Sequence, residues 1–90
     1  MRKIYNENPP KDGVKWIVRN LKICFSRDGI IEACNKNIEH WLDNGVSEDD
    51  RGVQFMRNLI NEMYINSHAM MFTYYSEKLE EYENAEITSK

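Results

Sequence analysis

Apolar positions between residues 13 and 25 recur at three- and four-residue spacing, which is the period of an α-helix. A strand is the alternative, because residues around Trp16 also alternate, but the alternation fails at Asn20 and the helical spacing does not. We therefore predict a first helix over residues 13–25. Trp16 and Ile23 fall off the main stripe, so this helix has more apolar surface than one core requires. The stripe consists of Val14, Ile17, Val18, Leu21, Cys24 and Phe25.

A second helix is predicted over residues 30–43. Ser26 or Asp28 is expected to cap it by accepting a hydrogen bond from a free backbone N–H group. Asn44-Gly45 is expected to end it, because glycine readily takes the left-handed conformation after a helix. Its apolar stripe is Ile31, Cys34, Ile38, Trp41 and Leu42.

The third segment, residues 47–83, has the strongest helix-start pattern in the chain. A serine cap at Ser47 is followed by three acidic residues, which favour the positive end of the helix dipole. The pattern fits one helix of over thirty residues or two helices broken near Asn66-Ser67. Its helically spaced apolar residues are Val53, Met56, Ile60, Met63, Met70, Tyr74, Leu79 and Tyr82.

These segments predict an all-α fold, a compact multi-helix bundle in a single domain of 90 residues. Residues 1–12 are expected to form an irregular arm, because the step before two prolines is extended and Asp12-Gly13 favours a turn. Residues 13–46 form the predicted N-terminal helical half and residues 47–83 the C-terminal half. Residues 84–90 are expected to fray.

Composition agrees with a folded protein of the cytoplasm. Apolar residues make up 41% of the chain and charged residues 30%, which is ordinary for a globular domain. The longest strongly apolar stretch, residues 69–75, is too short to cross a bilayer, and the N-terminus lacks the apolar core of a secretion signal. Cys24 and Cys34 are predicted to be free thiols that pack as small hydrophobic side chains.

The net charge of −3 hides an asymmetry along the chain. Residues 1–27 carry seven bases and two acids, a net +5, whereas the other 63 residues carry five bases and thirteen acids, a net −8. The acidic bulk argues against direct binding of nucleic acid. It suits a partner with a basic surface, such as a DNA-binding domain; a simply solvated charged surface is an equal alternative.

Catalytic and ligand-binding motifs are nearly absent. The chain has no glycine-rich phosphate loop, nucleophile elbow or HExxH sequence. A zinc site from Cys24, Cys34, His40 and His68 is disfavoured, since their spacing matches no zinc finger. We predict no catalytic residue, no cofactor and no metal, and hence no enzyme.

Two further clusters have a functional and a structural interpretation. Met70, Met71, Phe72, Tyr74 and Tyr75 can line a small-molecule pocket, although core packing with exposed hydroxyl groups is favoured. The acidic run at residues 80–83 can mimic DNA phosphates, but such runs more often form a solvated helix face.

A sequence motif at the end of the first helix adds a function. Phe25-Ser26-Arg27-Asp28 is followed by Ile30-Ile31-Glu32 and then by Gly45-Val46-Ser47. Over residues 18–51 the chain resembles, without a gap, the AsiA-type anti-sigma factors of T-even-like bacteriophages. The motif is specific only in this combination and spacing, and the total length is also similar.

The resemblance implies a concrete set of partners. Proteins of this family are all-helical and use their N-terminal half to bind region 4 of the primary bacterial sigma factor in RNA polymerase. Region 4 reads the −35 promoter element and docks on the flap of the β subunit. Binding blocks −35-dependent transcription, and a phage activator redirects the polymerase to phage middle promoters. The free protein of this family is a homodimer through an overlapping face.

We expect the first helix to supply the surface that contacts sigma or closes a homodimer. Fully burying an apolar side chain contributes roughly 1.5–3 kcal/mol, so several together supply an interface once the cost of association is met. The competing interpretation is that part of this stripe is simply core. The expected anchors are Val14, Ile17, Val18, Leu21 and Phe25, with Arg27 as a charge at the rim or a cap.

Two hypotheses compete with the anti-sigma factor. One is a small-molecule sequestering protein that binds a nucleotide signal through the methionine and tyrosine cluster, with Lys or Arg on the phosphates. The other is a structural homodimer whose acidic face mimics DNA. A sigma subunit, a nucleotide or a DNA-binding protein recovered with the chain would distinguish the three.

Overall fold

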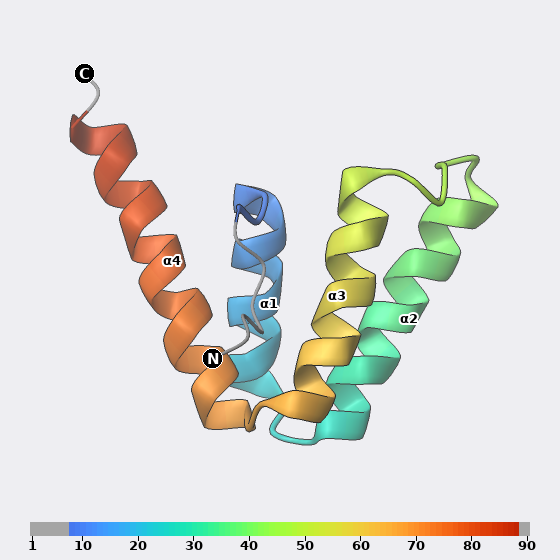
Figure 1. The fold of residues 1–90 in the computed structure, drawn as a ribbon, viewed down its shortest axis with the longest axis horizontal. Helices are drawn as coiled ribbons and strands as arrows, with labels where there is room; N and C mark the ends of the chain where they lie inside the picture. The colour runs from blue at the N-terminus through green and yellow to red at the C-terminus, as the bar shows by residue number, and fades with distance from the viewer. Residues whose placement is uncertain (1–7, 89–90) are drawn as a thin grey trace.

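Residues 8–88, which the computed structural model describes, form four α-helices joined by short connections (Figure 1). The helices run alternately in opposite directions, and this part of the chain contains no strand. The predicted all-α, multi-helix architecture is therefore confirmed. The helices are α1 (Lys11–Ile23), α2 (Arg27–Asp43), α3 (Arg51–Ile65) and α4 (His68–Thr88).

The four helices pack mainly as two pairs. α1 packs along α4, its distant neighbour in sequence, and α2 packs along α3. The pairs meet chiefly where α3 contacts α1 and α4, whereas α1 and α2 have almost no backbone contact although they are consecutive. Figure 1 shows α2 on the outer side of α3, away from α1.

The core is built from the helical stripes of all four helices. Its members are aliphatic, methionine and aromatic side chains that are nearly or completely inaccessible to solvent. Gly13 allows the close approach of α1 to α3, because a Cβ atom there would lie 2.6 Å from the ring of Phe55. The buried apolar residues are Val14, Ile17, Val18, Leu21, Ile30, Cys34, Ile38, Val53, Phe55, Met56, Leu59, Met63, Met71 and Tyr75.

The first helix starts two residues earlier than the pattern predicted. α1 begins at Lys11, directly after the extended Pro10, whose carbonyl accepts from the Val14 N–H at 3.0 Å. The Tyr82 hydroxyl donates to the carbonyl of Pro9 at 2.6 Å, which ties the preceding segment to α4. The turn expected at Asp12-Gly13 is wrong, because both residues lie within α1. Residues 1–7 of the predicted irregular arm lie outside the described residues.

The connection between α1 and α2 is short, and a side chain of this connection caps α2. α1 ends at Ile23, so Cys24 and Phe25 leave the helix in which the pattern placed them. The Ser26 side chain accepts a hydrogen bond from the Gly29 N–H at 3.2 Å. α2 therefore begins at Arg27, earlier than predicted, and Ser26 rather than Asp28 is the cap.

The turn between α2 and α3 confirms one prediction and corrects another. Gly45 takes a φ of +88°, the left-handed conformation expected after α2. The predicted cap at Ser47 is wrong: its hydroxyl accepts from the Asp49 N–H within a turn of its own. Asp50 caps α3, accepting from the Gly52 N–H at 2.8 Å. Glu48 binds Arg57 with both carboxylate oxygens, which holds the turn against α3.

The segment predicted over residues 47–83 contains two helices, α3 and α4. They are separated at Asn66-Ser67, where the pattern allowed a break. Asn66 ends α3 with extended backbone, and the Ser67 hydroxyl accepts from the Met70 N–H at 3.2 Å. α4 then continues to Thr88, so the fraying expected from residue 84 is not seen up to that point. An ion pair between Lys11 and Glu86 helps to hold this end. Residues 89–90 lie outside the described part.

Candidate protein-binding surfaces

The aliphatic stripe of α1 is buried within the bundle. Val14, Ile17 and Leu21 are completely inaccessible to solvent, and Val18 is 5% exposed. These four residues belong to the core, and α4 packs along α1. A partner therefore cannot touch them in this conformation. Their burial supports the competing interpretation, that this part of the stripe is core. Contact of these four residues with a partner stays a prediction that requires a different conformation.

Phe25 and Arg27 are the two predicted binding residues that the structure leaves accessible. Phe25 is 75% exposed and its ring lies 5.0 Å from the ring of His68. The Arg27 guanidinium lies 6.0 Å from the centre of the Tyr64 ring, a cation–π distance. Both contacts join the connection before α2 to the region where α3 meets α4.

His68 fixes this arrangement. Its Nε2 lies 2.8 Å from the carbonyl oxygen of Leu21 and 3.0 Å from that of Cys24. Both partners are acceptors, so Nε2 carries the proton and donates. The last carbonyls of a helix lack partners within the helix, and His68 satisfies one of them, that of Leu21, together with the carbonyl of Cys24, which follows α1. The histidine therefore has a structural role that sequence spacing did not predict.

The large exposed apolar side chains gather at this end of the bundle. Figure 1 shows that the connection from α1 to α2 and the connection from α3 to α4 lie at the same end. The exposed apolar residues are 49% to 75% accessible, whereas the apolar side chains of the core are sealed. We name as the end patch the residues Ile23, Phe25, Tyr64, Ile65 and Met70.

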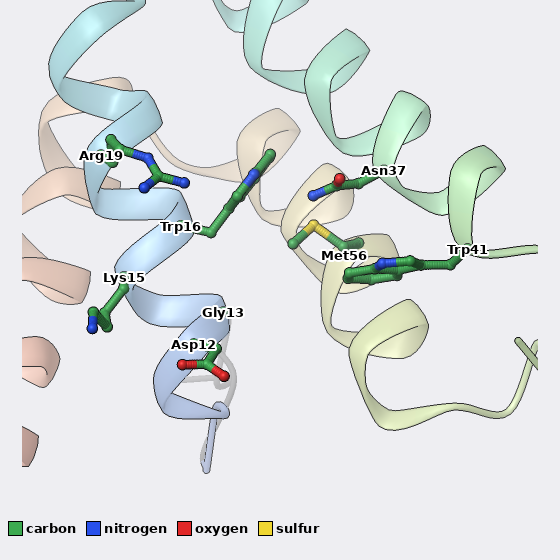
Figure 2. Close-up of a pocket in the computed structure, with 8 residues that line it drawn as sticks. All are labelled: Asp12, Gly13, Lys15, Trp16, Arg19, Asn37, Trp41 and Met56. Atoms are coloured by element: carbon green, nitrogen blue, oxygen red, sulfur yellow. The ribbon is translucent and has the colours of Figure 1, made fainter. Parts of the chain in front are cut away.

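A groove lies between α1 and the α2–α3 pair, and sequence reasoning did not predict it. Its volume is about 380 Å³. Figure 2 shows Trp16 of α1 and Trp41 of α2 on its two sides, with Met56 of α3 between them. The position of Trp16 off the main stripe of α1 was the signal that could have revealed it. The lining residues are Asp12, Gly13, Lys15, Trp16, Arg19, Asn37, Trp41 and Met56.

The methionine and tyrosine cluster does not form one pocket. Met71 and Tyr75 are completely buried, and the Tyr75 hydroxyl donates to the buried carboxylate of Glu62 at 2.6 Å. Met70 and Tyr74 instead line an open hollow of about 400 Å³ along α4. That hollow contains no basic residue to hold a phosphate, since its other lining residues are Ala69, Thr73 and Glu77.

The two cysteines have different surroundings. Cys34 is completely buried, and this burial raises the pKa of its thiol from 9.0 to about 12, so the thiol stays protonated and unreactive at neutral pH. Cys24 is half-buried, with its Sγ 3.7 Å from the carbonyl oxygen of Ser26. Residues 8–86 contain no group of three or more metal-ligating side chains.

Comparisons with protein-family models, curated proteins and solved structures gave no match. No helix in the described residues is long and apolar enough to cross a membrane.

Proposed function

We propose that this protein is a phage anti-sigma factor that binds region 4 of the host primary sigma factor in the bacterial cytoplasm. It would thereby block −35-dependent transcription and, with a phage activator, help to redirect the polymerase to phage middle promoters. The observation that carries the proposal is the end patch, which includes Phe25 of the Phe-Ser-Arg-Asp motif. The resemblance over residues 18–51 supplies the identity of the partner.

The end patch has the properties of a binding surface. Exposed apolar side chains scattered singly are ordinary, whereas a group at one site of a small protein indicates a partner. Phe25 and Tyr64 are aromatic residues with large contact areas, the type enriched at binding hot spots. Their contacts with His68 and Arg27 hold them in place before binding, which lowers the entropic cost of association.

The resemblance implies a homodimer of the free protein, and the end patch is a surface that such a dimer could use. We infer that two copies cover the end patch until sigma competes for it. The dimer must then open before region 4 binds, so the apparent affinity for sigma falls as the dimer becomes more stable. Any remodelling of region 4 requires unequal affinity for its two conformations.

Two variants and a control test the proposal. Purified protein is mixed with a sigma region 4 fragment, and the mass of the mixture is measured by light scattering. We expect a complex for the natural protein and at least a tenfold weaker one for Phe25→Ala, because truncating a central aromatic residue costs about 2 kcal/mol or more. Ile23→Ala should weaken binding less. Asn35→Ala, at an exposed position of α2, serves as the control.

Phe25→Ala should leave the fold intact, because its side chain is mostly in solvent. Circular dichroism checks that the variant is as helical as the natural protein. A mixture in which the natural protein and the region 4 fragment stay separate contradicts the proposal. Equal binding by Phe25→Ala and Asn35→Ala contradicts the assignment of the end patch.

A further inference from the structure

We propose that the partner that binds the end patch also covers the outer face of the first half of α4, so that one continuous apolar surface runs from Phe25 to Tyr74. The inference rests on the proposed function, because it assigns a further surface to the same partner. The resemblance, which covers residues 18–51, does not reach α4. The added surface is the hollow of about 400 Å³ lined by Ala69, Met70, Thr73, Tyr74 and Glu77.

Met70 joins the hollow to the end patch. It belongs to both, and 49% of its surface is exposed. Its N–H donates to the Ser67 hydroxyl, so Met70 lies in the first turn of α4, at the end of the bundle that carries the patch. His68, whose ring lies 5.0 Å from the ring of Phe25, belongs to the same turn. A partner seated on Phe25 is therefore within reach of the start of the hollow.

The lining residues form one outward face of α4. They make two adjacent rows at four-residue spacing, and residues at this spacing are neighbours on a helix surface. The row beside them, Met71 and Tyr75, is completely buried in the core, whereas Ala69 and Thr73 are exposed. A partner can therefore reach the hollow without any movement of α4. The two rows are Ala69, Thr73 and Glu77, and Met70 and Tyr74.

The chemistry of the hollow suits an apolar part of the partner. Glu77 is the single charged residue of the lining, and it is the last of these residues along α4. The half-buried Tyr74 ring is held by two contacts: it meets the Tyr75 ring edge to face at 4.9 Å, and the Lys78 Nζ lies 5.6 Å from its centre. A tyrosine fixed in this way offers contact area at a low entropic cost, and methionine adapts to varied apolar shapes.

A charge placed in the hollow tests this assignment. Ala69→Glu adds a carboxylate to the apolar lining, in the first turn of α4, where an acidic residue suits the helix dipole. Ala85→Glu makes the same change at an exposed position of the same helix outside the hollow and is the control. Each full-length variant is titrated with the sigma region 4 fragment by calorimetry, with circular dichroism as the check on folding. We expect binding by Ala69→Glu to be at least about tenfold weaker, because an unpaired charge in an apolar contact is costly, and binding by Ala85→Glu to be unchanged.

A second measurement detects coverage of the hollow without adding a charge. The thiol introduced by Thr73→Cys is modified with iodoacetamide, and peptide mass spectrometry separates it from Cys24 and Cys34. The bound fragment should slow this modification about tenfold when its concentration is about ten times the Kd. The thiol introduced by Asn35→Cys, at an exposed position of α2, should be modified at an unchanged rate.

Equal binding by the two glutamate variants overturns the assignment of the hollow, and so does a Thr73→Cys thiol that the bound fragment does not slow. Slowing that depends only on the concentration of this protein would show a second copy in the hollow and would overturn the assignment too. In each of these cases, region 4 binding that Phe25→Ala weakens leaves the proposed function standing. If the fragment does not bind the natural protein at all, the proposed function and the assignment of the hollow are both refuted.

Discussion

Two faces of the same helix have opposite roles in this protein. One face of α1 carries Val14, Ile17 and Leu21, which are sealed in the core where α4 packs along the helix. The groove face carries Trp16 beside exposed Arg19, and the end of the helix leads into exposed Phe25. A single amphipathic pattern therefore contains both the residues that hold the fold and the residues available to a partner. The two groups of residues differ in solvent exposure and not in apolar character.

Truncation of a buried residue of α1 should cause the largest loss of unfolding free energy. Leu21→Ala removes a completely buried side chain, and such changes cost about 2–5 kcal/mol of unfolding free energy. Ile23→Ala, two residues away and 74% exposed, should cost less than about 0.5 kcal/mol. Urea denaturation measures both. Similar losses for the two variants would show that α4 does not cover α1 as described.

A substitution at Gly13 tests the close packing of α1 against α3. Gly13→Ala places a methyl group against the Phe55 ring, where the ideal Cβ position lies 2.6 Å from the nearest ring atom. We expect a loss of about 1–3 kcal/mol, typical of overpacking in a core. Asp12→Ala, at the neighbouring exposed position, is the control. If Gly13→Ala is as stable as the control in thermal denaturation, the close crossing of α1 and α3 is refuted.

The pH dependence of the unfolding free energy tests the burial of the Cys34 thiol on α2. The pKa of Cys34 is raised to about 12 in the folded protein, from an ordinary value of 9.0. The unfolded chain therefore loses this proton first, and stability falls as pH rises above about 9. At pH 10 the loss from this group is about 1.4 kcal/mol relative to neutral pH.

The matched variant for this test is Cys34→Ala, which lacks the titrating group. Its unfolding free energy should fall by about 1.4 kcal/mol less than that of the natural protein between pH 7 and pH 10. Parallel pH curves for the two proteins would contradict the burial of Cys34. A thiol reagent should in addition modify half-buried Cys24 faster than Cys34.

The smallest loss of unfolding free energy is expected for a substitution in the connection between α1 and α2, which contains Phe25. Ser26→Ala removes the cap of α2, and loss of such a cap costs about 1 kcal/mol. Ser26→Asp keeps an acceptor for the Gly29 N–H and should preserve stability in urea denaturation. If the alanine and aspartate variants are equally stable, Ser26 does not cap α2 in solution.

The helical pattern alone was enough to predict the fold class and most of the core in α1 to α3. In α4 it was wrong by one position, because Met71 and Tyr75 are buried instead of the predicted Met70 and Tyr74. Gly45 marked the end of α2 correctly, because its left-handed backbone strongly favours glycine. Ser47 misled the prediction of the next start, because serine forms turns as readily as helix caps, and the turn here ends at Asp50. Local sequence could not decide between these two uses of the same side chain.

The candidate surfaces were harder to predict, since they depend on which helices pack together. The pattern identified the apolar stripe of α1, but it could not show that Val14 and Leu21 would be buried and Phe25 left exposed. The groove depends on the separation of α1 from α2, which no local signal contains. His68 likewise reaches Leu21 across 47 positions of sequence, a distance at which periodicity carries no information.

The decisive measurement is hydrogen–deuterium exchange of the full chain, with and without a sigma region 4 fragment, at a concentration at which the chain alone is monomeric. We expect slower exchange, on addition of the fragment, in the segments around the end patch, residues 23–27 and 64–70. Unchanged exchange in both segments at saturating fragment, or protection confined to other parts of the chain, would contradict it.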